Sequence, residues 1–397
     1  MQPKILLAKD TIDKADFDAL AAWLLIYPRL TKGNLTIEFE EKWAKKVKSE
    51  YAVFVNSGSS ANLLMLYALI AGNKLKNKKI VIPAISWITD IAPVIQFGLE
   101  PILCDINTYD LSVNLTELER IFSYEKPSCL LLVSVLGLVP HMQAVIELCN
   151  RYDVILLEDI CEGLGSSYEN RSLGNWGLMA TTSLYYGHHL STIEGGMITT
   201  DNKEMYDLLK MLRSHGWDRD LDPEIQTELR ESHKVDEFNI PYTFYHPGFN
   251  VRSTDLQAFI GLRQLDKFDN VVSRRNTNYN LYNKYLENHY WKPADYTNRF
   301  VSNLGYPIIH PFRDEIARVL VANGVECRPL ISGSMGTQPF FKRLYGEKYM
   351  HFASVLDKRG LYVPNHPYLL EEEIQYICSL INRVILEKPV EEKEFQV

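Results

Sequence analysis

The sequence predicts an α/β protein: a large domain with a mostly parallel, mixed sheet and helices on both faces, plus a smaller C-terminal α+β domain. Short runs rich in valine, isoleucine and leucine alternate with helical patterns through the first half of the chain. These runs lack polar alternation, which is typical of parallel strands buried on both faces. The 397 residues exceed what one hydrophobic core usually serves. We assign residues 1–250 to the large domain and residues 251–397 to the small one.

The elements of the large domain follow in a regular order. Apolar residues at three- and four-residue spacing predict helices within residues 14–50. A strand at residues 51–56 leads into a glycine–serine turn at 57–62 and an apolar helix at 63–69. Further strands are predicted at residues 80–83, 101–105, 129–134 and 154–159, with helices between them at 89–97, 115–122 and 142–152. Ligand-binding residues are expected at the carboxyl ends of such strands.

The pattern changes after residue 201. A helix at residues 205–214 precedes the polar, irregular stretch 216–248, which is too long for an ordinary connection and is therefore expected to be functional. A helix at residues 253–268 follows. The last third mixes strands at 304–310 and 325–329 with helices at 315–323 and 371–386, as in a compact α+β domain.

Composition excludes several classes of function. The net charge is −8 and the lysines and arginines are dispersed, so no nucleic-acid partner is expected. No apolar run approaches the roughly 20 residues that span a bilayer, and the N terminus lacks a signal peptide, which predicts a cytoplasmic protein without a membrane partner. The six cysteines are scattered without a C-x-x-C pair, so no zinc or iron–sulfur site is expected.

The glycine–serine turn after the first strand is a candidate anion site. Ser57, Gly58 and Ser59 stand where a helix begins. Backbone N–H groups, serine hydroxyls and the positive end of a helix dipole together favour a phosphate group. A plain helix N-cap would use the same residue types, so this segment alone leaves both interpretations open.

Asp159 is a second candidate, because it ends an otherwise apolar strand. A buried ionised carboxylate needs a partner, since leaving it unpaired is costly. A protonated pyridine nitrogen is one suitable partner. The alternative is that Asp159 forms the N-cap of a helix at the strand end.

Two adjacent histidines, His188 and His189, lie in a polar turn between two predicted strands. A metal site is not expected here, because adjacent side chains of an extended segment point in opposite directions. No neighbouring set of cysteine, histidine or aspartate completes a zinc shell either. Taken alone, the pair is interpreted as structural, with one histidine in the core and one exposed.

Five motifs stand in one order along the chain: Ser57-Gly-Ser-Ser-Ala-Asn62, Pro83-Ala-Ile-Ser-Trp87, Glu158-Asp-Ile-Cys-Glu162, Ser183 with His188 and Glu194-Gly-Gly196, and Gly248-Phe-Asn-Val-Arg252. Together they resemble the sugar aminotransferases, pyridoxal-phosphate enzymes of the aspartate aminotransferase fold, fold type I, that act on nucleotide-linked keto sugars. The resemblance covers nearly the whole chain. It implies that the large domain binds pyridoxal 5'-phosphate.

The resemblance also implies roles for residues that contact the cofactor phosphate. Ser57, Gly58 and Ser59 would bind it together with Ser183. Asn250 would reach the phosphate bound by a neighbouring subunit, which implies a homodimer with shared active sites.

Around the cofactor ring, the resemblance implies that Trp87 stacks on the pyridine, Asp159 pairs with its nitrogen and Glu162 lies near its hydroxyl. One departure changes the expected chemistry. The family's cofactor-linking lysine belongs six residues before Glu194, where this chain has His188, and no lysine occurs from residue 127 to residue 202. Imidazole is not a primary amine, so the cofactor, as pyridoxal or pyridoxamine 5'-phosphate, is expected to bind non-covalently. Histidine still exchanges protons near neutral pH.

This departure resembles the 3-dehydratases of the same family. The resemblance implies a lyase that removes the C3 hydroxyl of a nucleotide-linked 4-keto-6-deoxy sugar, above all the GDP-linked mannose derivative, with His188 as base. L-glutamate would regenerate pyridoxamine phosphate. Iron–sulfur-dependent dehydratases carry the same replacement of lysine by histidine. They need a clustered set of cysteines, which the six scattered cysteines of this chain do not provide. Two alternatives stay open: an aminotransferase that recruits a distant lysine, and a non-catalytic cofactor-binding homologue. The sequence does not distinguish a 6-deoxyhexose from a 6-deoxyheptose.

Substrate residues are expected in the second half of the chain. Within His215-Gly-Trp-Asp-Arg219, we expect Arg219 to contact the nucleotide diphosphate and His215 to lie near the sugar. Arg328 is a second anion candidate, for the glutamate carboxylate or the substrate phosphates. Tyr242 and Phe244 are expected to cover the partner's site in the dimer. For each arginine, an ordinary surface position is the alternative.

Overall fold

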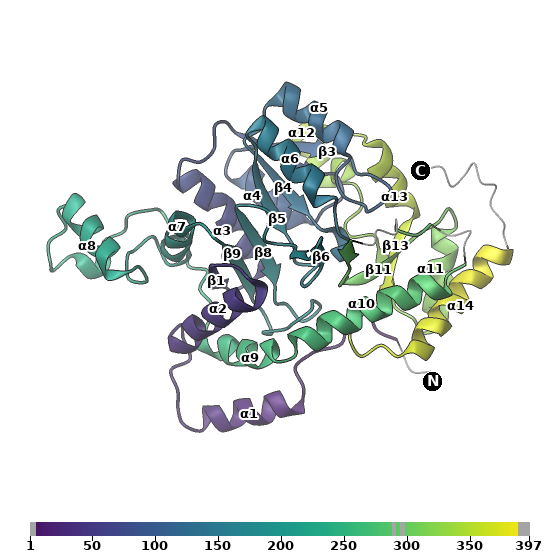
Figure 1. Cartoon of the computed structure of the whole chain (residues 1–397), viewed down its shortest axis with the longest axis horizontal. Helices are drawn as coiled ribbons and strands as arrows, with labels where there is room; N and C mark the ends of the chain where they lie inside the picture. Colours follow the sequence, from purple (N-terminus) through teal and green to yellow (C-terminus); the bar gives the residue numbers. More distant parts are fainter. Residues whose placement is uncertain (1–4, 288–290, 294–297, 388–397) are drawn as a thin grey trace.

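The computed structural model describes residues 5–287, 291–293 and 298–387. Its centre is a seven-stranded sheet in the order β1-β9-β8-β5-β4-β2-β3 (Figure 1). Strand β9 runs antiparallel to both of its neighbours, and the other pairs are parallel. The strands are β1 (Tyr51–Val55), β2 (Lys79–Pro83), β3 (Glu100–Cys104), β4 (Cys129–Val133), β5 (Ile155–Asp159), β8 (Met179–Ser183) and β9 (Gly196–Thr200). The predicted mostly parallel, mixed sheet is confirmed.

Helices cover the sheet, and nearly every strand residue is buried. The covering helices are α2 (Asn34–Val47), α3 (Gly58–Ala71), α4 (Ile88–Gln96), α5 (Leu115–Glu125), α6 (Met142–Tyr152) and α7 (Lys203–Arg213). Helix α3 begins earlier than the predicted residue 63, because Ser57 caps it directly after β1. The anion-site candidates therefore lie in the first turn of a helix whose interior is almost wholly apolar.

The C-terminal part is an antiparallel sheet with helices, as predicted. Strands β11 (Gly305–Ile309), β13 (Gly360–Pro364) and β12 (Arg328–Pro329) form this sheet, in that order. Helices α11 (Arg313–Ala322), α12 (Pro339–Tyr345), α13 (His351–Arg359) and α14 (Glu371–Glu387) accompany it. Helix α10 (Phe268–Tyr285) runs from the large domain to this sheet (Figure 1). Helix α9 (Asp255–Leu265) packs against α2, where a Cβ on Gly261 would lie 2.5 Å from the Phe39 ring. The boundary at residue 250 stays a prediction.

Residues 216–248, here called the arm, project from the large domain at the left of Figure 1. The sequence predicted an irregular segment, but the arm contains helix α8 (Pro223–Ser232), which starts at a proline and has no buried residue. Its apolar residues are too few to show the helical period clearly. The described residues also form α1 (Lys14–Leu24), β6 (Ser167–Tyr168), β7 (Arg171–Ser172), β10 (Arg299–Phe300) and three short 3₁₀ helices, η1 (Val135–Gly137), η2 (Ile240–Tyr242) and η3 (Met335–Thr337).

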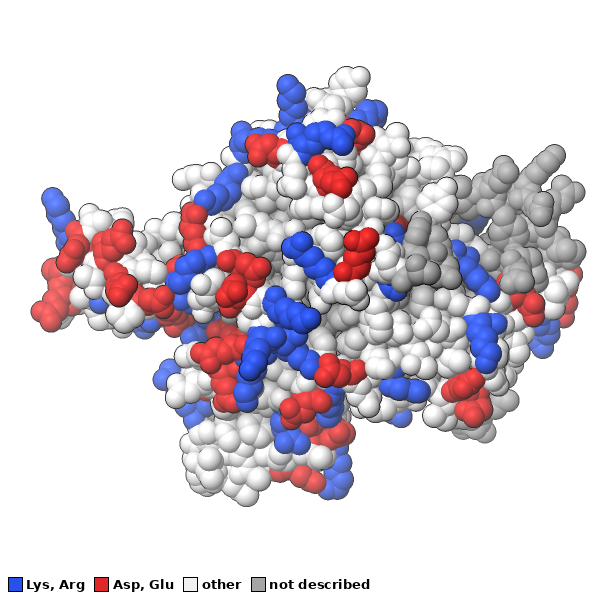
Figure 2. All heavy atoms as spheres, in the orientation of Figure 1, with Lys and Arg blue, Asp and Glu red and all other residues white. Residues whose placement is uncertain are grey.

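On the face drawn in Figure 2, lysines and arginines are interspersed with acidic residues over the body, and several acidic residues lie on the arm. Basic side chains do not form a continuous stripe on this face. None of the helices in the described ranges is both long enough and apolar enough to cross a bilayer.

Candidate active site

A cleft of about 540 Å³ opens at the carboxyl ends of the parallel strands. Both domains contribute to it, since the small domain supplies Leu304, Arg328 and Tyr362. The predicted site residues that line it are Ser57, Gly58, Ser59, Trp87, Asp159, Glu162, Ser183, His188 and Arg328. These residues come from five separate segments, at 57–59, 87, 159–162, 183–188 and 328, and most of them meet in one cavity as the rule for parallel sheets predicts.

The first turn of α3 forms one end of this lining. The Ser57 hydroxyl accepts a hydrogen bond from the Ser60 backbone N–H at 3.0 Å, so Ser57 is an N-cap. A Cβ on Gly58 would lie 2.8 Å from Cβ of Ser183, and one on Gly196 would lie 2.2 Å from the Ser57 carbonyl oxygen. Glycine at both positions lets three backbone segments meet at the helix start. This arrangement suits an anion bound by backbone N–H groups and hydroxyls.

Asp159 lies at the end of β5 and is 5% exposed. Its Oδ1 accepts from the Cys161 N–H at 2.8 Å, and its Oδ2 accepts from Nδ2 of Asn62 at 2.6 Å. The residues that follow, 160–178, contain no helix, so the alternative of a helix N-cap is wrong. Its two oxygens are thereby held in a fixed orientation at the end of β5. The site thus presents a carboxylate that suits a cationic ligand atom.

Sequence reasoning missed the partners of Asp159. Asn62 also donates to Oδ1 of Asp90 at 3.1 Å, and its amide oxygen accepts from the Thr181 hydroxyl at 2.6 Å. Asp90 is buried, and burial followed by the negative charge of Asp159 raises the pKa of Asp90 well above its ordinary value. This shift favours the protonated form of Asp90. The available signal was Asn62 itself, a polar side chain in an otherwise apolar helix.

His188 presents a free base to the cleft. Its Nδ1 lies 2.7 Å from the carbonyl oxygen of Cys161. A carbonyl only accepts, so Nδ1 carries the hydrogen and Nε2 keeps its lone pair. Burial lowers the pKa of His188, although the Cys161 carbonyl and the charge of Asp159 act in the opposite direction. The imidazole is therefore neutral near pH 7.

His189 has a different environment and does not line the cleft. It is 1% exposed, and its Nε2 lies 2.9 Å from the Ser302 carbonyl oxygen. Burial lowers the pKa of His189 well below its usual range. Within the described ranges, no group of three or more metal-binding side chains is assembled. The pair thus divides into one histidine of the cleft and one of the core.

Glu162 is a second proton-carrying group in the cleft. Its Oε2 accepts from the Leu136 N–H at 2.5 Å. Burial, the largest cause, and the charge of Asp159 raise the pKa of Glu162 to about 8. Tyr362, which sequence reasoning missed, lines the same cavity, and burial raises its pKa to about 12. Arg328 pairs with Tyr362 across β12 and β13, so the small domain places one cation in this lining.

The remaining predicted residues do not line the cleft of their own chain: His215, Arg219, Tyr242, Phe244 and Asn250. They gather instead at the base of the arm. The Arg219 guanidinium lies 3.8 Å from the centre of the Trp217 ring, and Phe244 stacks on that ring at 6.2 Å. Tyr242 is 77% exposed, and Asn250 is also exposed where it bridges Ser214.

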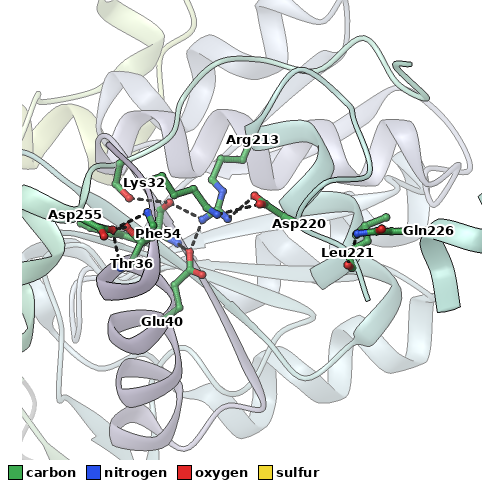
Figure 3. Close-up of polar contacts among 11 residues, drawn as sticks. Lys32, Thr36, Glu40, Phe54, Arg213, Asp220, Leu221, Gln226 and Asp255 are labelled. Carbon is green, nitrogen blue, oxygen red and sulfur yellow. Dashed lines mark hydrogen bonds and ion pairs between the residues drawn. The ribbon is translucent and has the colours of Figure 1, made fainter. Parts of the chain in front are cut away.

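A buried polar network fixes the base of the arm (Figure 3). Arg213, 1% exposed, donates to the Phe54 carbonyl at 2.9 Å and forms ion pairs with Glu40 and Asp220. Lys32 pairs with Asp220 at 3.0 Å. Asp255 accepts at 2.8 Å from the N–H of Gly33, just before α2. The arm therefore starts from a point that is tied to α2 and β1.

The cleft fits a phosphorylated pyridine. It combines an anion site at the start of α3, a buried carboxylate at Asp159 for a protonated ring nitrogen, and the half-exposed Trp87 ring for stacking. The residues that line it include no lysine, so no lining residue can attach an aldehyde cofactor covalently.

This fold and this cleft are those of a pyridoxal-phosphate-dependent enzyme. The chain belongs to the DegT/DnrJ/EryC1/StrS aminotransferase family, whose model matches residues 11–382. It is 33% identical to GDP-4-keto-6-deoxy-D-mannose 3-dehydratase of Escherichia coli O55:H7, over 94% of this chain and 98% of that protein. The E. coli enzyme with bound hydrated PLP superposes with a TM-score of 0.86 at 31% identity, over 96% and 99% of the two chains. The structure of a GDP-4-keto-6-deoxymannose-3-dehydratase with a trapped PLP-glutamate geminal diamine superposes with a TM-score of 0.85 at 31% identity, over 94% of this chain and 99% of that chain.

Proposed function

We propose that the protein is a pyridoxal-phosphate-dependent lyase that removes the C3 hydroxyl of a nucleotide-linked 4-keto-6-deoxy sugar, with GDP-4-keto-6-deoxy-D-mannose as the expected substrate. One observation carries the proposal: the cleft presents a neutral histidine, His188, where sugar aminotransferases have a lysine, and none of the described residues that line it is a lysine. The relatives that bear the dehydratase name cover nearly the whole chain.

When bound, pyridoxamine phosphate supplies the electron sink for the elimination. Ser57, Gly58 and Ser59, with Ser183, would hold its phosphate, and Asp159 would keep the ring nitrogen protonated. Asn62, which also donates to Asp90, orients the Asp159 carboxylate toward that task. The ring thus acquires a fixed position without a covalent bond.

The proposed proton-transfer groups are His188, Glu162 and Tyr362, and burial shifts the pKa of each. Nε2 of His188 accepts a proton near neutral pH, because Nδ1 is already committed to the Cys161 carbonyl. Glu162 keeps its own proton up to about pH 8 and can donate a hydrogen bond. Tyr362 stays a neutral phenol throughout this range.

L-glutamate is the proposed co-substrate and the source of two electrons. It leaves as 2-oxoglutarate and ammonia, while the sugar exchanges its C3 hydroxyl for hydrogen and the hydroxyl leaves as water. The dehydratase structure that carries a PLP-glutamate adduct supports this choice. Arg328 is the proposed contact for an anionic group, because it is the arginine in the cleft lining.

We also propose a homodimer with shared sites. Asn250, Tyr242 and Phe244 are exposed and do not line the cleft of their own chain, so a role at a cofactor or substrate requires a second subunit. Arg219 and His215, on the same arm base, would contact the sugar nucleotide there. The cytoplasmic location stays a prediction.

The test is an assay of the purified protein with cofactor, L-glutamate and GDP-4-keto-6-deoxymannose. We expect 2-oxoglutarate, ammonia and a product with one oxygen fewer by mass spectrometry. An amino sugar without free ammonia would instead indicate an aminotransferase, and borohydride would then leave cofactor covalently attached. Binding of cofactor with no product from any 4-keto sugar nucleotide would indicate a non-catalytic protein.

A further inference from the structure

A buried arginine that has no carboxylate partner among the described residues contacts the turn that carries His188. Arg275 lies on α10 and is 2% exposed. Its Nη1 donates to the carbonyl oxygens of Asn303 at 3.2 Å, Leu304 at 2.9 Å and Asn365 at 2.7 Å. Its Nη2 donates to the carbonyl oxygen of His188 at 3.2 Å. The Arg275 guanidinium therefore links the small domain to the turn that carries His188.

This arginine contrasts with Arg213, which is equally buried. Arg213 forms ion pairs with Glu40 and Asp220, and these acids outweigh burial and raise its pKa. Arg275 has no carboxylate within ion-pair distance among the residues that the structure describes, and burial lowers its pKa to about 9. A buried charge that is balanced only by carbonyl dipoles is costly to maintain. That cost points to a role beyond holding two segments together.

We propose that Arg275 is a positioning residue for the reaction: it holds the His188 backbone through the His188 carbonyl and brings a positive charge, unpaired among the described residues, to the turn that carries this base. The inference rests on the proposed function, in which His188 is that base. Neither effect requires Arg275 to touch substrate or cofactor.

The groups around His188 explain why a cation is useful there. Asp159 is negative and favours the imidazolium, and the Cys161 carbonyl accepts from Nδ1 and has the same effect. Burial acts in the opposite direction, and so does the charge of Arg275. His189 is neutral, and the ring of Tyr185 lies 6.4 Å away edge-on. A carboxylate paired with Arg275 would cancel its charge, so the carbonyl-only environment preserves the opposition to Asp159.

The hydrogen bonds of Arg275 also fix the position of His188 relative to the small domain. Asn365 donates through Nδ2 to the Asn303 carbonyl at 2.9 Å and to the Arg275 carbonyl at 3.2 Å. The carbonyl of Leu304, a residue of the cleft lining, shares Nη1 with these groups. A shift of the small domain would therefore pull on the His188 carbonyl through a single side chain.

Two substitutions separate charge from shape. Arg275→Gln removes the positive charge and keeps an N–H donor. Arg275→Lys keeps the positive charge and loses the planar pair of Nη donors that reaches several carbonyls at once. The pKa of His188 is measured by NMR titration of the ring in the full-length protein, with the signal assigned by its loss in His188→Asn. In the wild-type protein we expect a value below the ordinary ~6.5. Arg275→Gln should raise it by about half to one pH unit, and Arg275→Lys should leave it unchanged.

Turnover supplies the second readout. Arg275→Gln should move the acid limb of the kcat/KM profile upward with the pKa of His188, and Arg275→Lys should lower kcat without changing KM. An unchanged His188 pKa in Arg275→Gln would overturn the electrostatic role. If that variant does not fold, Arg275→Lys decides, because an unchanged kcat there overturns the positioning role. The titration needs no turnover, so it distinguishes a failure of this inference from a failure of the proposed dehydration.

Discussion

The cleft and the arm are built in opposite ways. Cleft side chains lie at strand ends and hold one another: Asp159, for example, has a hydrogen-bond donor on each oxygen. The arm is attached by ion pairs of Asp220 with Arg213 and of Asp222 with Lys203, and it then presents exposed rings such as Tyr242 and Phe244. The difference teaches that the lining of the cleft is assembled within one chain, whereas the arm presents its rings on the surface of that chain.

The sharpest test of this division is His188→Asn. We expect kcat to fall by about 10²–10⁴-fold, because the proton acceptor is lost. Cofactor binding, followed by absorbance of the bound form, should be kept, since no proposed cofactor contact is changed. His351→Asn, an exposed histidine of the small domain, is the matched control. Normal turnover by His188→Asn would place the base elsewhere.

Asp159→Asn tests the cofactor half of the cleft. It removes the charge offered to the ring nitrogen and disturbs the pair with Asp90, so the cofactor Kd should rise by about 100-fold. Fluorescence titration with pyridoxal phosphate measures this value. A cofactor Kd equal to that of the wild-type protein would refute the ring-nitrogen role.

Arg219→Ala tests the arm. Here the expected change is a rise of about tenfold in KM for the sugar nucleotide, from the loss of one charge-assisted contact with its diphosphate. The cofactor Kd should not move. Lys234→Gln, an exposed cation farther along the arm, serves as the control. Equal effects of the two substitutions on KM would mean that only the net charge of the arm matters.

The smallest effect concerns stability and pH. The pKa of Glu162 is raised to about 8 in the folded chain, so between its ordinary value near 4.3 and pH 8 the folded state holds a proton that the unfolded state has lost. Stability therefore falls as pH rises through this window. Glu162→Gln should remove that fall, and Tm at pH 8 should exceed that of the wild-type protein. Parallel Tm profiles of the two proteins would contradict the raised pKa.

The sequence predicted most reliably those site residues that directly follow a buried strand. Buried strands predicted the sheet, and the residues that follow them, such as Ser57, Trp87 and Asp159, meet in the cleft because parallel strands end at one edge. The replacement of lysine by His188 was legible without a structure. These features depend on local pattern and on order along the chain.

Other parts of the site depend on contacts between distant segments. Asp90 lies in the first turn of α4, and only the fold brings it to Asn62 and Asp159. Arg275 is one cation among many on a polar helix until packing buries it against the His188 carbonyl. Helix α8 escaped prediction because its apolar residues, Ile225 and Leu229, are too few to reveal its period.

The lysine-free lining of the cleft affects how the protein depends on its surroundings. A cofactor held without a covalent bond follows mass action, so the loaded fraction depends on the free cofactor concentration. Its contribution to the free energy of unfolding grows as RT ln(1 + [L]/Kd), about 2.7 kcal/mol at one hundred times Kd. Dialysis alone should therefore empty the protein and lower its Tm, and pyridoxamine phosphate should restore both. Supply of the cofactor thus becomes a control on the amount of folded enzyme.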